Sequence, residues 1–167
     1  MSDTPFKVAI ITSSDTGYAG EREDKSAPVI EKFVTEAGYD VVEKILLPDD
    51  KEMLSAAMAK ICDANSADLI LTTGGTGFSP RDVMPEATKA IIHREAPGIP
   101  EAMRWFSLQI TGRAMLTRAA AGIREKTLIV NMPGSPKAVA ECLEYILPHL
   151  HHGLEILTGR TSNCARK

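Results

Sequence analysis

Apolar residues along this chain recur in two alternating patterns, which predict strands and helices in turn. Short runs rich in β-branched residues are typical of buried strands, and residues 7–12, 39–47, 68–73 and 126–131 contain them. Between these runs the apolar residues recur at helical spacing, which predicts helices over residues 25–37, 50–62, 85–95, 100–110, 136–147 and 148–157. Pro148 is expected to bend or restart the last helix, and residues 114–123 fit either a strand or a helix.

The alternation of strands and helices predicts the fold class. A β-α-β-α-β order implies a parallel sheet with right-handed crossovers and with helices on both faces. The chain has 167 residues, of which 44% are hydrophobic, and this is enough for a sizeable core. We therefore expect an α/β three-layer sandwich with a mostly parallel central sheet, formed by residues 1–167 as a single domain.

Charge and composition exclude several classes of function. A net charge of −3 and a pI near 5.8 argue against binding of nucleic acid through a general basic surface. No apolar run approaches membrane-spanning length, and residues 1–7 lack the apolar stretch of a signal peptide. Cys62, Cys142 and Cys164 form neither a CxxC pair nor an even framework, so a reduced, cytoplasmic setting is expected.

A glycine-rich turn follows the third predicted strand. Gly74, Gly75 and Gly77 have no Cβ, so the backbone N–H groups around them can approach an anionic ligand closely. The spacing matches neither the Walker loop nor the dinucleotide fingerprint. Arg81 and Asp82 follow, a cation suited to phosphate and a carboxylate suited to a metal ion. Asp82 also fits as the cap of the helix that comes next.

Polar residues follow the other predicted strands as well. Ligands of open α/β sheets collect at the carboxyl ends of the strands, so the loops there are expected to form one site. After the second strand, Asp50 is most simply a helix cap, which leaves Asp49 as the better metal-ligand candidate. Ser135, before Pro136, is also a plausible cap. Hydroxyls, backbone amides and carboxylates without a nucleophilic triad suit phosphate binding with a divalent metal better than acyl transfer.

Four motifs follow the predicted strands: PDD (48–50), TTGGTG (72–77), PRDVMPEAT (80–88) and NMPGSPKAV (131–139). Together they resemble a known family, the molybdopterin adenylyltransferases of molybdenum-cofactor biosynthesis. The segments ITSSDTGYAGEREDKSAPVI (11–30) and LTRAAAGIREKTLIVNMPGSP (116–136) are similar to that family too. The similarity extends over roughly residues 7–158, which is nearly the whole chain.

The resemblance implies a reaction, a cofactor and partners. Family members transfer an adenylyl group from ATP to the terminal phosphate of molybdopterin with Mg²⁺, and they release pyrophosphate. A homotrimer and a downstream molybdate-insertion protein are implied as partners. Asp49 and Asp82 match the catalytic, Mg²⁺-binding acidic positions. The resemblance also implies residues that bind the substrates and their phosphates: Thr12, Ser13, Asp24, Gly74, Gly75, Thr76, Gly77, Ser107, Asn131, Pro133, Gly134 and Ser135. Arg81 is added to them because of its place on the glycine-rich loop.

Three positions depart from the family pattern, and two other functions stay open. Met84 stands where threonine is common, Ser79 lies in a variable loop, and Thr117 replaces a serine while keeping a hydroxyl. None of these changes affects Asp49 or Asp82. One alternative is a non-catalytic molybdopterin-binding or scaffolding module with the same fold. The other is a generic nucleotide-binding regulator, against which the missing Walker and dinucleotide patterns count.

Overall fold

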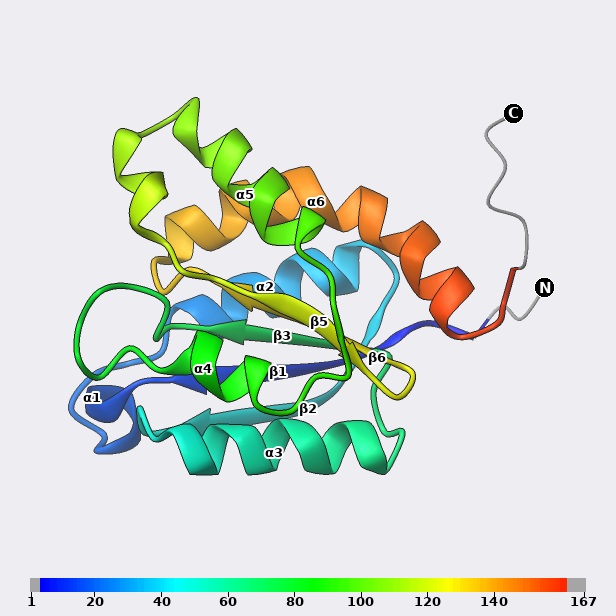
Figure 1. Cartoon of the computed structure of the whole chain (residues 1–167), viewed down its shortest axis with the longest axis horizontal. Helices are drawn as coiled ribbons and strands as arrows, with labels where there is room; N and C mark the ends of the chain where they lie inside the picture. Colours follow the sequence, from blue (N-terminus) through cyan, green and yellow to red (C-terminus); the bar gives the residue numbers. More distant parts are fainter. Residues whose placement is uncertain (1–3, 162–167) are drawn as a thin grey trace.

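Six strands form one mixed sheet in the order β2-β1-β3-β6-β5-β4 (Figure 1). The computed structural model describes residues 4–161, so Cys164 and both extreme ends of the predicted domain lie outside the described residues. The strands are β1 (Lys7–Ser13), β2 (Asp40–Leu47), β3 (Leu69–Thr73), β4 (Arg94–Glu95), β5 (Ala121–Arg124) and β6 (Thr127–Met132). β2, β1, β3 and β6 are parallel, β5 is antiparallel to β6, and β4 is antiparallel to β5.

Helices cover both faces of this sheet. They are α1 (Asp15–Tyr18), α2 (Ser26–Glu36), α3 (Lys51–Asp63), α4 (Met84–Lys89), α5 (Gly98–Leu108), the 3₁₀ helix η1 (Gly112–Leu116) and α6 (Pro136–Leu157). α2, α5 and α6 pack on one face, and α3 and α4 pack on the other (Figure 1). The predicted three-layer sandwich with a mostly parallel sheet is therefore confirmed. None of the helices within residues 4–161 is long and apolar enough to cross a membrane.

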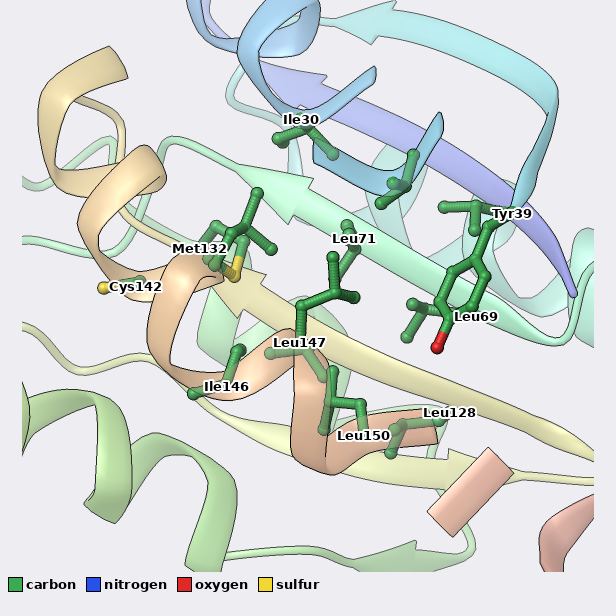
Figure 2. Close-up of a cluster of buried hydrophobic side chains, with 14 of the residues drawn as sticks. Ile30, Tyr39, Leu69, Leu71, Leu128, Met132, Cys142, Ile146, Leu147 and Leu150 are labelled. Atoms are coloured by element: carbon green, nitrogen blue, oxygen red, sulfur yellow. The ribbon is translucent and has the colours of Figure 1, made fainter. Parts of the chain in front are cut away.

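The two helical layers enclose two separate hydrophobic cores. β1 supplies both of them, because its side chains alternate between the faces of the sheet. Val8 and Ile10 pack into the core beneath α2 and α6, whereas Ala9 and Ile11 pack into the core above α3 and α4. Figure 2 shows the first core, where side chains of β3 and β6 meet those of α6. Since both faces are covered, β1, β3 and β6 are almost wholly buried, as their apolar runs predict.

The helix predicted over residues 85–95 forms only in its first half, and the prediction is wrong for residues 90–95. α4 ends at Lys89, and the chain then turns into the short strand β4. The backbone N–H of His93 donates to the carbonyl of Ile123 at 2.8 Å, so this segment forms sheet hydrogen bonds in place of helical ones. The β-branched pair Ile91 and Ile92 favours that outcome, because such side chains suit extended backbone better than a helix.

The other departures are also local. α6 continues through Pro148 without restarting, and Pro148 lies on its exposed side, where the carbonyl that loses its partner can face water. The ambiguous residues 114–123 divide into the end of η1, the segment 117–120 outside any helix or strand, and the start of β5. The short helix α1 has no counterpart among the predicted elements. Gly38 has a φ of +83° just after α2, which confirms it as the expected helix stop.

Candidate active site

A cleft lies where the direction of chain connection reverses in the sheet. The chain leaves β1 toward β2 and then returns past β1 to β3, so β1 and β3 form the switch point at which α/β sheets bind ligands. The cleft has a volume of about 780 Å³. Its lining residues come from three loops: Thr12, Ser13, Ser14, Gly17 and residues 21–26 after β1, Thr73 and Gly74 after β3, and residues 134–136 after β6. Six predicted site residues are therefore brought together here, namely Thr12, Ser13, Asp24, Gly74, Gly134 and Ser135.

Gly74 is the point at which the three loops touch. It has a φ of +88°, and a Cβ built on it would lie 2.3 Å from the backbone oxygen of Ser13. On its other side, a Cβ on Gly134 would lie 3.4 Å from the Cα of Gly74. The Thr73 hydroxyl donates to the carbonyl of Pro133 at 2.7 Å, which joins the β3 and β6 loops beside this contact. No residue with a side chain fits at position 74 without moving the backbone.

Asp24 organises the start of α2 at the cleft. Its Oδ1 accepts hydrogen bonds from the backbone N–H groups of Ser26 and Ala27, and its Oδ2 accepts one from the Thr12 hydroxyl at 2.6 Å. The Ser26 hydroxyl then donates to the carbonyl of Gly134 at 2.8 Å. These contacts set the N-terminus of α2 next to the loop that begins α6. Ser135 accepts from the N–H of Ala138, so its predicted role as the cap of α6 is confirmed.

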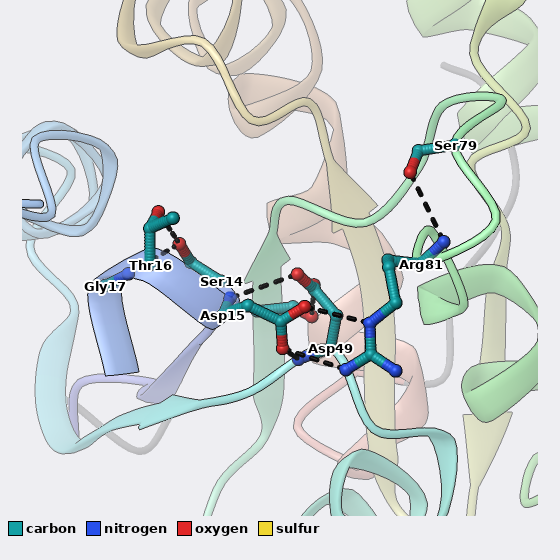
Figure 3. Close-up of polar contacts among 8 residues, drawn as sticks. Ser14, Asp15, Thr16, Gly17, Asp49, Ser79 and Arg81 are labelled. Atoms are coloured by element: carbon teal, nitrogen blue, oxygen red, sulfur yellow. Dashed lines mark hydrogen bonds and ion pairs between the residues drawn. The ribbon is translucent and has the colours of Figure 1, made fainter. Parts of the chain in front are cut away.

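Asp49 lies behind the cleft wall and is held by the loop after β1 (Figure 3). Its Oδ1 accepts from the Ser13 hydroxyl at 2.5 Å, and its Oδ2 accepts from the backbone N–H of Asp15 at 3.1 Å. The N–H of Asp49 in turn donates to Oδ1 of Asp15 at 2.9 Å. The neighbouring Asp50 caps α3 by accepting from the N–H of Met53, as expected. Through Ser13, Asp49 is thus one hydrogen bond away from the cleft.

Arg81 makes a two-pronged ion pair with Asp15 (Figure 3). Its Nε and Nη2 each donate to one carboxylate oxygen of Asp15, both at 2.9 Å. This contact joins the loop after β3 to the loop after β1, across the position of Asp49. The hydrogen bond from Arg81 is the main cause that lowers the pKa of Asp15 below its usual value of 3.8, and the N–H of Asp49 lowers it further. Arg81 is therefore paired with a carboxylate of the protein itself.

The Arg81–Asp15 pair gives a testable pH dependence. Since the pKa of Asp15 is lowered in the folded protein, the pair is intact at neutral pH and is lost only as the pH falls through that lowered value. In Arg81→Gln we expect the pKa of Asp15 to rise toward 3.8, with the N–H of Asp49 keeping part of the shift. Carboxyl-carbon NMR titration measures this change. Asp63, whose pKa is lowered by Arg124, is the internal control, and its value is expected not to move.

Asp82 occupies the loop between β3 and α4. Its Oδ2 accepts from the backbone N–H of Ser79 at 2.9 Å, and its own N–H donates to the carbonyl of Ser79 at 2.9 Å. The carboxylate lies directly over Gly77, since a Cβ built there would be 2.9 Å from Oδ2. α4 has Val83 at its N-cap position without a side-chain cap, so the alternative role of Asp82 as a helix cap is wrong.

The two aspartates are suited to Mg²⁺ as partial ligands. Within residues 4–161, no three His, Cys, Asp or Glu side chains are grouped so that they could hold a metal by themselves. Mg²⁺ is commonly bound by one or two carboxylates, with waters and substrate phosphates as the other ligands. Asp49 and Asp82 are both partly exposed. The hydrogen bonds described above leave lone pairs on each carboxylate, because each oxygen has two.

Other residues expected at the site lie outside the cleft lining. Ser107 is on α5, with its hydroxyl 3.6 Å from the thiol sulfur of Cys142 on α6. Asn131 is fully buried within β6. Thr76 is buried at the end of the glycine turn, and its carbonyl accepts from the N–H of Arg118 at 2.8 Å. Gly75, Gly77, Arg81 and Pro133 flank the lining residues along the same loops.

Both polar atoms of the Asn131 side chain form hydrogen bonds within the protein. Its Nδ2 donates to the hydroxyls of Thr72 and Thr88, and its Oδ1 accepts from the N–H of Ala120. Asn131→Ala leaves these buried groups without a partner, so we expect a loss of about 2–4 kcal/mol in the free energy of unfolding. Urea denaturation measures it. Gln109→Ala, which removes an exposed amide, is the control and is expected to change stability by less than about 0.5 kcal/mol.

The sequence reasoning assigned no role to several residues at or near the cleft. Arg22 and Lys25 line the cleft together with Glu21 and Glu23, and Asp15 holds both Asp49 and Arg81. All of them lie after β1, at the carboxyl end of a buried strand, and this placement is the signal that points to them, although it does not distinguish one from another. Their charges alone were not informative, because charged loop residues most often face solvent.

Comparisons with known proteins show the family to which this chain belongs. A family profile described as "Probable molybdopterin binding domain" matches residues 9–152. A molybdopterin adenylyltransferase of Helicobacter pylori is 36% identical over 154 residues, which cover 91% of this chain and 88% of that protein. The Escherichia coli protein of the same name is 39% identical over 141 residues, covering 83% and 72%. This chain belongs to the molybdopterin adenylyltransferase family.

Solved structures with the same fold as this chain are also known. The molybdopterin biosynthesis enzyme MoaB from Thermus thermophilus superimposes with a TM-score of 0.88 and is 44% identical, with 92% of this chain and 97% of that chain covered. The agreement extends over nearly all of both chains, so this chain shares its three-layer sandwich with that enzyme.

Proposed function

We propose that this chain transfers the adenylyl group of ATP to the terminal phosphate of molybdopterin and releases pyrophosphate, with Mg²⁺ as cofactor. The observation that carries the proposal is the meeting of three features at one cleft. These are the glycine turn at Gly74, the N-terminus of α6, and the carboxylate of Asp49 one hydrogen bond behind the wall. Helix N-termini and glycine-rich turns both favour bound phosphate groups.

The chemistry requires alignment more than acid–base catalysis. An oxygen of the molybdopterin phosphate is already anionic at neutral pH, so it attacks the α-phosphorus of ATP without a protein base. A new P–O bond forms, and the bond to the leaving pyrophosphate breaks with its electron pair. Two polyanions repel each other strongly at short range, so charge neutralisation and fixed geometry lower the barrier. Arg22 and Lys25 in the lining and the positive end of the α6 dipole serve this purpose. Glu21, Glu23 and Asp24 lie in the same lining, so these cations do not neutralise two polyanions by themselves and a bound cation adds to their effect.

Asp49 and Asp82 would hold the Mg²⁺ ion. When bound, Mg²⁺ supplies positive charge that stabilises the leaving pyrophosphate. Ser13 and the N–H of Asp15 keep the Asp49 carboxylate in one orientation, and the N–H of Ser79 does the same for Asp82. Arg81 exchanges its contact with Asp15 for a phosphate oxygen, which keeps its charge paired in both states.

One incubation tests the proposal and separates it from its main alternative. The purified chain is mixed with molybdopterin, ATP and Mg²⁺, and pyrophosphate release is followed, with Asp49→Ala and removal of Mg²⁺ by chelation as controls. Pyrophosphate that requires molybdopterin and disappears in both controls supports the enzyme. Saturable molybdopterin binding without turnover contradicts it and favours the scaffolding module. ATP binding without molybdopterin binding favours the nucleotide-binding regulator.

We propose that the chain acts as one cytoplasmic domain that assembles into a homotrimer. Several large apolar side chains of α5, η1 and the turn between them are exposed, and one of them, Trp105, is 58% exposed. The others are Leu108, Ile110, Met115 and Leu116. Apolar side chains gathered in this way favour contact with another protein surface. Light scattering of the purified chain measures the mass of the assembly. A downstream molybdate-insertion protein would receive the product.

A further inference from the structure

Arg118 contacts both ends of the loop between β3 and α4. It lies in the extended segment between η1 and β5, outside the cleft. Its Nε donates to the carbonyl of Gly77 at 2.8 Å, and its Nη2 donates to the carbonyl of Asp82 at 2.7 Å. Its Nη1 contacts the carboxylate of Glu86 on α4, and its backbone N–H donates to the carbonyl of Thr76. One side chain thus closes the loop into a ring.

The loop itself has little packing to hold it. Residues 78–81 are all exposed, and Phe78 at its tip is 71% exposed. In Figure 1 the segment between β3 and α4 projects from the end of the sheet near α1. Its order therefore depends on polar contacts: hydrogen bonds within the turn from Ser79 to Asp82, the pair between Arg81 and Asp15, and the hydrogen bonds from Arg118.

Arg118 also fixes the orientation of two peptide planes. In a trans peptide the C=O group and the following N–H group point in opposite directions, and this chain has no cis peptide among its described residues. When Arg118 holds the carbonyls of Gly77 and Asp82, the N–H groups of Phe78 and Val83 are directed away from it. The same contacts keep the carboxylate of Asp82 over Gly77.

We propose that Arg118 is a positioning residue for adenylyl transfer, which sets the loop that carries Arg81 and Asp82 without itself touching either substrate. The inference rests on the proposed function. A guanidinium group suits this role because its planar fork can serve two carbonyls and a carboxylate at once, whereas a lysine amine is a single point. The side chain of Arg118 is 34% exposed, and the loop carbonyls that it holds can be hydrated when it is removed. Its loss therefore disorders the loop more than it destabilises the protein.

The test compares Arg118→Ala and Arg118→Lys with the wild-type chain by two measurements. Hydrogen–deuterium exchange without substrates reports the order of residues 76–84, and steady-state kinetics report kcat and KM. In Arg118→Ala we expect exchange of this segment to quicken, with the rest of the chain unchanged. We expect kcat to fall by about 10²-fold, the scale of a small misplacement at a reacting centre, while KM for molybdopterin changes little. Arg118→Lys is expected to be intermediate, and free guanidinium ion at a non-denaturing concentration is expected to restore part of the kcat of Arg118→Ala.

Glu86→Gln is the matched control. It removes the charge of the third partner of Arg118 but leaves an oxygen that can still accept a hydrogen bond, so exchange and kcat are expected to stay near wild type. Unchanged exchange in Arg118→Ala overturns the inference, and so does a loosened loop with unchanged kcat. If the wild-type chain itself releases no pyrophosphate, the proposed function fails whatever the variant does. If wild type turns over and Arg118→Ala matches it in both measurements, only the inference fails.

Discussion

Asp82→Asn is expected to lower kcat for adenylyl transfer by about 10²–10³-fold, the usual scale when one charge-stabilising group is removed from a site. Asparagine has nearly the shape of aspartate, and its amide oxygen can still accept from the N–H of Ser79, so the loop is expected to keep its form. What is lost is one negative charge that would hold Mg²⁺. Pyrophosphate release measures turnover, and molybdopterin binding measured separately is expected to stay within about threefold of wild type, a difference of less than about 1 kcal/mol.

Asp50→Asn is the matched control for this prediction. It removes a charge from the loop next to Asp49, but asparagine caps a helix as well as aspartate does, so α3 is preserved. We expect its turnover to stay near wild type. Equal losses of molybdopterin binding and turnover in Asp82→Asn would contradict a role in metal binding and would make Asp82 a structural residue of the loop.

Gly74→Ala is expected to destabilise the folded protein by about 3 kcal/mol, a large effect for a single methyl group. Two causes act together. A φ of +88° is strained for any residue with a side chain, and the new Cβ would lie 2.3 Å from the backbone oxygen of Ser13. That neighbour is backbone at the end of a buried strand, so it cannot move aside as a flexible side chain would. Urea denaturation measures the loss.

Gly153→Ala adds the same methyl group but is expected to raise the stability of the folded protein. Gly153 lies inside α6, and a Cβ built on it meets no atom within 4 Å. Alanine is a better helix former than glycine, so we expect stability to rise by about 0.5–1 kcal/mol. A similar loss of stability in both variants would mean that the close approach of Gly74 to Ser13 is not what destabilises Gly74→Ala.

The parts of the fold that were predicted are those in which local pattern and burial agree. β1, β3 and β6 are covered on both faces, so their apolar runs were unambiguous. β4 could not be predicted, because two residues at a sheet edge carry no periodic signal and depend on pairing with β5. The course of α6 past Pro148 depended on which side of the helix faces water, and that is decided by packing.

The candidate site also has parts that the sequence indicates and parts that depend on the folded structure. The glycine turn was singled out because residues without a Cβ follow a predicted strand, and Asp49 because Asp50 already serves as the helix cap. Asp15 was not assigned a role, since its importance comes from a partner, Arg81, that is 66 residues away in sequence. Asn131 was expected to bind a ligand, yet its amide is used entirely within the core. Sequence identifies which loops meet, whereas the choice of partner for each polar group depends on distances that only the folded chain provides.

The contact between Arg160 and the carbonyl of Thr4 has a practical consequence for protein engineering. Arg160 also lies 4.0 Å from the ring centre of Phe6, just before β1, so the two ends of the described chain adjoin at the edge of the sheet where its parallel strands begin. The cleft beside Gly74 is at the opposite edge. Another polypeptide joined at Thr4 or at Arg160 would therefore lie away from the cleft, and a circularly permuted chain that links these two residues by a short peptide is expected to fold.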